Sequence, residues 1–279
     1  MKFAGIIAEY DPFHNGHAWQ LAQAKALGAE RVAVAMSCSL VQRGALPLLP
    51  EAVRTRSALT CGADLVFALP APCACAGAEA FARAGVALLA AAGCDGLVFG
   101  AEMPDAALLM EAAELLDSDS YRAALKAQLA GGARSFAAAR QAAAAELASD
   151  ERVAALLDKP NNNLAVEYCR AIRSLAPRME AYPLPRQGAN HGEALHSAHG
   201  QFASASALRK LWAEGGVDAV APYVPEAVFP LYQEAYAAGQ YTDFSAAGRC
   251  ELALLRSACR GKAPFADIRG VFQAEVQVK

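Results

Sequence analysis

The first hundred residues alternate between short, continuously apolar segments and segments rich in helix-forming residues. The apolar segments contain many β-branched residues and predict strands, whereas the segments between them predict helices. We expect strands at 3–10, 31–37, 64–70 and 95–100, and helices at 18–27, 51–61 and 78–92. Continuous apolar runs are typical of strands covered on both faces, so the pattern predicts an α/β fold with a doubly wound parallel sheet.

The pattern becomes almost wholly helical over about 105–157 and then returns to the α/β alternation. A run of Asp, Lys, Pro and Asn residues breaks it at 158–163, and we expect a helix at 164–175 after that break. The last strand of the sheet is predicted near 180–184. We therefore expect one domain at 1–214 with a helical insertion, and a helical C-terminal extension at 215–279.

Composition and charge restrict the class of protein. The net charge of −3 provides no overall positive field for nucleic acid, so any such contact must be local. The eight cysteines form no Cys-x-x-Cys pair, which is typical of a reduced, cytoplasmic protein. The apolar start is too short for a signal peptide, and prolines interrupt the most apolar stretch at 65–78. We expect neither secretion nor a membrane span.

The residues with the clearest chemical meaning stand where the first strand turns into the first helix. His14 and His17 flank Gly16, and Pro12 fixes the turn before them. Ligands of open α/β sheets bind at such turns, and a helix N-terminus attracts phosphate oxygens. Two imidazoles add directed hydrogen-bond donors. The pattern therefore favours binding of nucleotide phosphates and phosphoryl or nucleotidyl transfer.

A zinc site and a structural role are the other interpretations of the histidines. A zinc site would need further ligands, yet His191, His196 and His199 belong to another segment without Glu or Cys at ligand spacing, so no metal site is predicted. A structural role is the ordinary alternative for a single histidine. No P-loop and no Gly-x-Gly-x-x-Gly motif follows the first strand, so the histidines themselves must serve the phosphates.

Residues 5–17 read Gly-Ile-Ile-Ala-Glu-Tyr-Asp-Pro-Phe-His-Asn-Gly-His and resemble nucleotidyltransferases, more closely the tRNA(Met) cytidine acetate ligase family. Further segments are similar to successive blocks of that family, in the same order, and together cover about 3–212. They are Ser37 with 41–44, 62–66 with Leu69-Pro70, 98–102, 159–168, 186–191 and 204–209. The resemblance implies a Rossmann-like sheet of the nucleotidyltransferase type.

The resemblance also implies a reaction in two steps. Acetate attacks the α-phosphate of ATP, giving acetyl-adenylate and pyrophosphate, and the wobble cytidine of elongator tRNA(Met) then takes the acetyl group to give N4-acetylcytidine. Mg²⁺ is expected with ATP because the phosphates need charge neutralisation, although no carboxylate pair identifies its ligands.

The same resemblance assigns roles to particular residues. His14 and His17 would be the catalytic donors, Arg186 would bind phosphate, and Gly100 and Asn162 would contact the adenosine part. The ordinary alternatives are a turn glycine at Gly100 and helix-capping asparagines. The full set expected to contact ATP is Ile7, Ala8, Glu9, Tyr10, Pro12, Phe13, His14, Asn15, Gly16, His17, Gly100, Asn161, Asn162, Arg186, Gln187, Ser204 and Arg209.

Several positions depart from the family pattern. Asp11 replaces the usual asparagine, Cys38-Ser39 replaces Gly-Asn, and Pro50-Glu51 replaces an Asp-Lys pair, so an expected basic side chain is lost. The similarity fades after 267–271, whereas family members are longer. We expect a shortened C-terminus to affect the tRNA step most.

Two other functions stay open. One is a different adenylyltransferase that acts on a phosphorylated small molecule, against which the Pro-Asn-Asn and Arg-x-Gly-Ala blocks argue. The other is a non-catalytic nucleotide-binding remnant, suggested by the lost basic residue and the shortened end.

Overall fold

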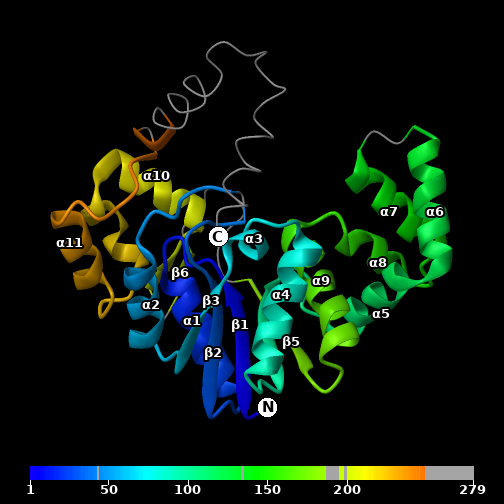
Figure 1. Cartoon of the computed structure of the whole chain (residues 1–279), viewed down its shortest axis with the longest axis horizontal. Helices are drawn as coiled ribbons and strands as arrows, with labels where there is room; N and C mark the ends of the chain where they lie inside the picture. Colours follow the sequence, from blue (N-terminus) through cyan, green and yellow to red (C-terminus); the bar gives the residue numbers. More distant parts are fainter. Residues whose placement is uncertain (43, 133–134, 187–194, 198–199, 245, 249–279) are drawn as a thin grey trace, which may run out of the picture. The chain divides into compact units, whose positions relative to one another are not determined.

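Five parallel strands form the central sheet, in the order β3-β2-β1-β4-β5 (Figure 1). Their bounds are β1 Phe3–Ala8, β2 Arg31–Ser37, β3 Leu65–Leu69, β4 Gly96–Ala101 and β5 Glu180–Pro185. The predicted α/β class with a doubly wound parallel sheet is confirmed. The strand order reverses between β1 and β4, so the carboxyl ends of these two strands form the switch point at which such sheets bind ligands.

The computed structural model describes the chain except residues 43, 133–134, 187–194, 198–199, 245 and 249–279. The chain divides into two units, Met1–Gln240 and Tyr241–Lys279. Residues 215–240 therefore belong to the same unit as the sheet, and every residue discussed below lies in that unit. The boundary at residue 214 stays a prediction.

Helices cover both faces of the sheet (Figure 1). On one face, α4 and α9 pack over a core that includes Leu89, Leu97 and Val166; on the other, α1, α2, α10 and α11 surround Ile6, Leu21 and other apolar residues. The helices are α1 Asn15–Ala26, α2 Glu51–Thr60, α3 Ala71–Ala74, α4 Ala78–Ala91, α5 Ala106–Asp117, α6 Asp119–Ala130, α7 Phe136–Leu147, α8 Glu151–Leu156, α9 Pro160–Leu175, α10 Ala205–Gly215 and α11 Phe229–Ala237. A 3₁₀ helix, η1 (Val217–Tyr223), and a short antiparallel pair, β6 (Leu195–Ser197) with β7 (Gly200–Phe202), complete the elements.

Two helices begin earlier than the sequence pattern predicted. Helix α9 starts at Pro160 rather than 164, because proline suits the first helical position and the asparagines that follow form its first turn. Helix α1 starts at Asn15 rather than 18, because the side chain of His14 caps it. Both corrections move candidate site residues from loops into helix N-termini, where backbone N–H groups have no partner within the helix.

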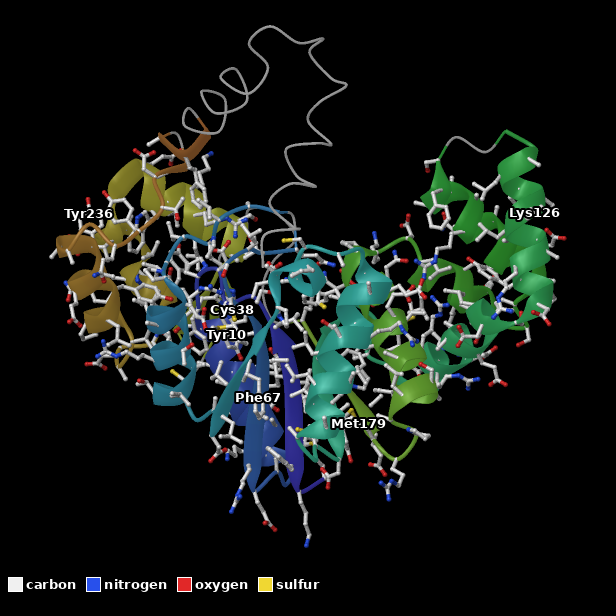
Figure 2. All side chains as sticks on the ribbon, viewed as in Figure 1. Tyr10, Cys38, Phe67, Lys126, Met179 and Tyr236 are labelled. Carbon is white, nitrogen blue, oxygen red and sulfur yellow. The ribbon has the colours of Figure 1, made fainter. Side chains whose placement is uncertain are left out.

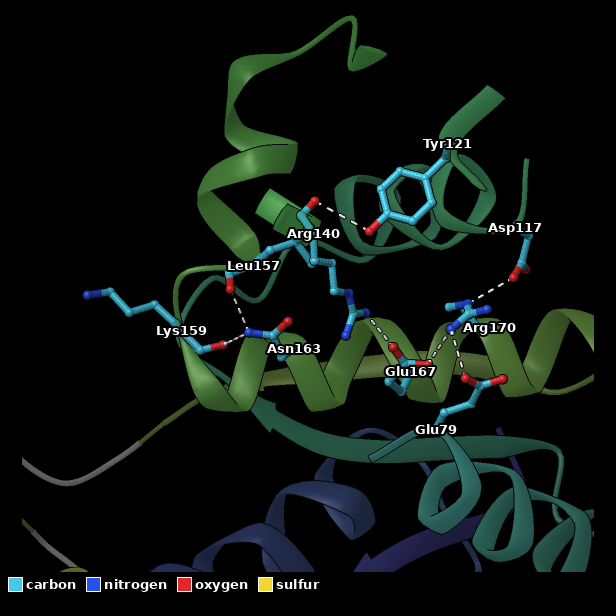
Figure 3. A network of polar contacts seen from close by, with 9 residues as sticks. All are labelled: Glu79, Asp117, Tyr121, Arg140, Leu157, Lys159, Asn163, Glu167 and Arg170. Carbon is cyan, nitrogen blue, oxygen red and sulfur yellow. Dashed lines mark hydrogen bonds and ion pairs between the residues drawn. The ribbon is translucent and has the colours of Figure 1, made fainter. Parts of the chain in front are cut away.

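A network of buried and half-buried polar side chains connects helices α5, α6 and α7 with helix α9 (Figure 3). The carboxylate of Glu167 on α9 is buried and accepts hydrogen bonds from Arg140 of α7 and Arg170 of α9. Arg170 also donates to Asp117 of α5 at 2.8 Å. The hydroxyl of Tyr121 on α6 donates to the carbonyl oxygen of Arg140. The helices of residues 106–147 are thereby tied to the helix that carries Asn161 and Asn162.

Candidate functional site

The turn after β1 is held in an unusual conformation. Tyr10 has a φ of 50°, in the left-handed region that non-glycine residues seldom adopt, and the Asp11–Pro12 peptide bond is cis. The side chain of Tyr10 is buried and packs edge-on against Phe13 and His17, with ring centroids 4.9 and 4.8 Å apart. Figure 2 shows Tyr10 and Cys38 at the end of the sheet where β1 and β2 stop.

His14 and His17 lie together at the N-terminus of α1. Their rings stack with centroids 3.7 Å apart. Nδ1 of His14 accepts a hydrogen bond from the backbone N–H of Gly16 at 3.0 Å, and Nδ1 of His17 accepts one from the N–H of His14 at 3.3 Å. A Cβ on Gly16 would lie 2.9 Å from Cε1 of His14, so glycine is required for the ring to fold over the helix end.

The surroundings keep both imidazoles neutral. Burial, and to a smaller extent the Arg186 guanidinium, together lower the pKa of His14 to about 3. The pKa of His17 is well below its usual range, because of burial first and then of His14 and Arg186. A neutral imidazole whose Nδ1 accepts carries its proton on Nε2. Each ring therefore has an Nε2–H available as a donor, which is the form that suits phosphate oxygens.

Arg186 follows β5 and connects the end of β4 to the first turn of α9. Its backbone N–H donates to the carbonyl oxygen of Ala101 at 3.2 Å, and its guanidinium donates to Oδ1 of Asn161. A Cβ on Gly100 would lie 3.3 Å from Cγ of Arg186, so the side chain of Arg186 passes over Gly100. The structure thus brings together His14, His17, Gly100, Asn161 and Arg186 at the switch point.

The first turn of α9 is fixed by a carboxylate that sequence analysis did not place in the site. Glu102 accepts hydrogen bonds from the backbone N–H of Asn161 at 3.2 Å and that of Asn162 at 2.7 Å, and from Nδ2 of Asn161 at 2.5 Å. Oδ1 of Asn162 accepts from the N–H of Met103 at 3.0 Å, and the side chain of Asn162 is buried. Asn161 is half-buried, so of the two it is the one with side-chain surface left for a ligand.

Arg209 contacts the turn through one of its guanidinium nitrogens. Its Nη1 donates to the carbonyl oxygen of Asp11 at 2.6 Å and contacts Oδ2 of the same residue at 3.2 Å. Oδ1 of Asp11 accepts from the N–H of Leu48 at 2.6 Å. The carboxylate found where the family pattern has asparagine is thus paired with a cation. Ser204 caps α10 by accepting from the N–H of Ala207.

The remaining residues predicted to contact ATP pack in the core or bond to the backbone of neighbouring segments, except one that the structure does not describe. Pro12 and Phe13 are buried, and Asn15 is buried with its amide turned to backbone carbonyls of residues 201 and 222. Ile7 and Ala8 are half-buried in β1, and the carboxylate of Glu9 accepts from the N–H of Gln42 at 2.6 Å. Gln187 lies outside the described residues.

Sequence analysis did not find Arg54, which organises the neighbouring loop. This side chain is fully buried, and it donates to the carbonyl oxygens of Glu9 at 2.7 Å, Ser37 at 2.6 Å, Leu49 at 3.0 Å and Cys38. An arginine in a helix ordinarily suggests an exposed position, so the sequence carried no signal for it. Glu51 occupies the position of the lost basic residue and lies beside Cys38. Burial, and then the Glu51 carboxylate, raise the pKa of the Cys38 thiol to about 11.

The described residues lack a metal cluster and a membrane-spanning helix. They contain no group of three or more His, Cys, Asp or Glu side chains arranged to hold a metal ion. No helix in the described part of the chain is long and apolar enough to cross a membrane.

Comparison with known proteins gives a consistent result. The family HIGH Nucleotidyl Transferase matches residues 1–260. The tRNA(Met) cytidine acetate ligase of Syntrophotalea carbinolica is 40% identical over 82% of the chain and 58% of the relative. The ligase of the same name from Caldanaerobacter subterraneus subsp. tengcongensis is 35% identical over 86% of the chain and 60% of the relative.

Solved structures agree with these relatives. Thermotoga maritima TmcAL bound with alpha-thio ATP superposes with a TM-score of 0.77 and 30% identity, over 86% of the chain and 57% of that protein. The apo form of the same protein gives a TM-score of 0.78. The resemblance predicted from the sequence is confirmed. The chain spans somewhat under two thirds of the length of the relatives that it matches.

Proposed function

Because the chain belongs to the HIGH nucleotidyl transferase family, we propose that it binds ATP at the turn between β1 and α1 and activates acetate there. The observation that carries the proposal is the stacked, neutral pair of His14 and His17 beside Arg186. In support, the solved relative with 30% identity was crystallised with an ATP analogue. The similar curated proteins are named for a reaction that uses acetate.

In the first step, a carboxylate oxygen of acetate attacks the α-phosphorus of ATP. The bond to the bridging oxygen breaks, pyrophosphate leaves with the electron pair, and acetyl-adenylate remains. Negative charge builds on the α-phosphate and on the leaving group. The Nε2–H groups of His14 and His17 and the guanidinium of Arg186 would donate to these oxygens.

In the second step, the exocyclic N4 amine of the wobble cytidine of elongator tRNA(Met) attacks the acetyl carbonyl carbon. AMP leaves, the amine loses a proton, and N4-acetylcytidine forms. A tRNA substrate would place the reaction in the cytoplasm. This step is proposed from the relatives' names alone, and the chain matches only part of their length.

Mg²⁺ bound to the triphosphate would neutralise part of its charge. The described residues contain no acidic cluster for such an ion. We therefore assign no side chain to Mg²⁺, and the residues named above act on the phosphates directly.

The test is exchange of radiolabelled pyrophosphate into ATP, with and without acetate. Exchange that requires acetate supports the adenylation step, and transfer of labelled acetate to unmodified elongator tRNA(Met) supports the second. Exchange driven instead by a phosphate ester such as nicotinamide mononucleotide would replace the proposal with another adenylyltransferase. ATP binding without any exchange would favour a nucleotide-binding remnant.

A further inference from the structure

Residues far along the chain contact the backbone of the histidine turn. The hydroxyl of Tyr232 on α11 is fully buried and donates to the carbonyl oxygen of Phe13 at 2.7 Å. That carbonyl belongs to the peptide bond that joins Phe13 to His14. The N–H on the other side of the same peptide bond donates to Nδ1 of His17 at 3.3 Å.

A hydrogen-bond chain therefore passes through one peptide group. It runs from the Tyr232 hydroxyl to the Phe13 carbonyl, and from the His14 N–H to Nδ1 of His17. A bond accepted by the carbonyl oxygen polarises the peptide and strengthens its N–H as a donor. Tyr232 thus acts on His17 without touching it: it orients the peptide plane and favours the tautomer with the proton on Nε2.

Asn15 fixes the other side of His14. Its side-chain Nδ2 donates to the carbonyl oxygens of Gln201 at 3.0 Å and Pro222 at 3.2 Å, and the residue is buried. An amide NH₂ has two donors, and both are used here. Asn15, the first residue of α1, is therefore anchored to β7 and to η1. Its side-chain Nδ2 has no N–H left to donate to a ligand.

We propose that Tyr232 and Asn15 are positioning residues that hold the His14–His17 pair in its donor form and geometry, without contacting substrate. The backbone of the turn is then held on both sides of His14, at Phe13 and at Asn15. Small displacements of groups that must meet a reacting phosphate are costly to the rate, because catalysis depends on alignment. Only the kinetic part of this inference rests on the proposed function.

The variant that tests the proposal is Tyr232→Phe, which removes the hydroxyl and keeps the ring in the core. Its matched control is Tyr121→Phe on α6, which also removes a buried hydroxyl that donates to a backbone carbonyl, that of Arg140. A general loss of stability would be shared by both variants. The imidazole ¹⁵N NMR signals of the free protein at pH 7 distinguish a protonated Nε2 from a protonated Nδ1, and they report on the histidines without any substrate.

In Tyr232→Phe we expect the Nδ1 signal of His17 to shift, because the His14 N–H becomes a weaker donor to this nitrogen, while Tyr121→Phe leaves the signal unchanged. In pyrophosphate exchange, kcat should fall about tenfold with KM for ATP within about threefold of the parent. Asn15→Asp, which replaces two donors by a carboxylate facing two carbonyls, should have the same kinetic signature. Unchanged histidine signals in Tyr232→Phe would overturn the proposal, and the NMR result stands even if the protein exchanges no pyrophosphate.

Discussion

At the scale of single residues, burial keeps the two histidines neutral, and the proposed reaction uses them as hydrogen-bond donors. Replacing His14 or His17 by alanine removes an Nε2–H donor that is needed most when charge builds on the phosphates. We expect kcat for exchange to fall about 100-fold or more, with KM for ATP changed much less. Steady-state exchange kinetics check this. A loss confined to KM would remove the proposed catalytic role.

The lowered pKa of the histidines makes stability depend on pH. Above the ordinary histidine pKa of about 6.5, neither the folded nor the unfolded state takes up these protons. Below it the unfolded chain binds them while the folded protein does not, until the pH approaches the folded pKa of His14, about 3. Unfolding free energy should fall by up to about 1.4 kcal/mol per pH unit per histidine as the pH drops from 6.5 to 5.

Urea unfolding at pH 7, 6 and 5 measures this slope. A variant with both His14→Gln and His17→Gln is the control, since it keeps the other histidines and all carboxylates. Its slope should be flatter than that of the parent. Parallel slopes would mean that the two rings titrate normally in the folded protein.

Among the residues that hold the loop after β2, we expect substitution of Arg54 on α2 to lower the unfolding free energy most. Arg54→Met leaves four carbonyl oxygens without their donor, and we expect a loss of about 3–5 kcal/mol. Arg56→Met on the same helix is the control, because the side chain of Arg56 is exposed and its ion pair with Glu234 spans 3.6 Å. Equal losses in the two variants by urea unfolding would contradict this role.

Residue chemistry was predictable where it follows from neighbouring positions. The position of His-x-Gly-His between a first strand and a first helix predicted that His14 and His17 share one face, and their rings stack. The helix cap made by His14 is also a local contact, but it was not predicted. Arg54 and Tyr232 were missed because their partners are backbone carbonyls, 5 to 45 residues away from Arg54 and 219 residues away from Tyr232, and any residue type supplies a carbonyl.

At the scale of elements, α9 links the candidate site to helices α5 to α7. Glu167→Leu would leave Arg140 and Arg170 without their buried partner, and we expect a loss of about 2–4 kcal/mol in unfolding free energy. Asp119→Ala removes a largely exposed partner of Arg122 on α6 and should cost less than about 0.5 kcal/mol. Thermal or urea unfolding compares the two, and a similar cost for both would show that the buried network adds nothing.

Element types were predictable, but their ends were not. Strand β1 stops at Ala8 rather than at Tyr10, because Tyr10 adopts a left-handed backbone conformation that apolar composition does not reveal. The asparagines at 161–163 suggested that no helix begins before 164. The carboxylate of Glu102 accepts hydrogen bonds from N–H groups of the first turn of α9, so this helix begins at Pro160. For α9, a contact between distant segments thus decided a local boundary.

At the scale of the whole molecule, alternating strands and helices predicted the parallel sheet. The sequence pattern did not predict the order of the strands, or that residues 215–240 pack in the core beside the sheet. These residues supply Val220, Val228 and Tyr232 to the core shared with Ile6 and Leu21.

A chain that stops after Glu214 would lose these core contacts. At about 1.5–3 kcal/mol for each buried side chain, the loss is comparable with the total stability of a domain. We expect the 1–214 chain to lack a cooperative unfolding transition, whereas a chain of residues 1–240 keeps it. Circular dichroism melts distinguish the two, and a cooperative melt of the shorter chain would support the boundary at 214.

The bond from Tyr232 to Phe13 also has a consequence for protein synthesis. The two partners are 219 residues apart, and the contacts of Asn15 with Pro222 and of Asp11 with Arg209 span 207 and 198 residues. The histidines leave the ribosome before the groups that fix them, which are translated about two hundred codons later. Nascent chains arrested before residue 232 has emerged would therefore carry the motif without a settled arrangement of its rings.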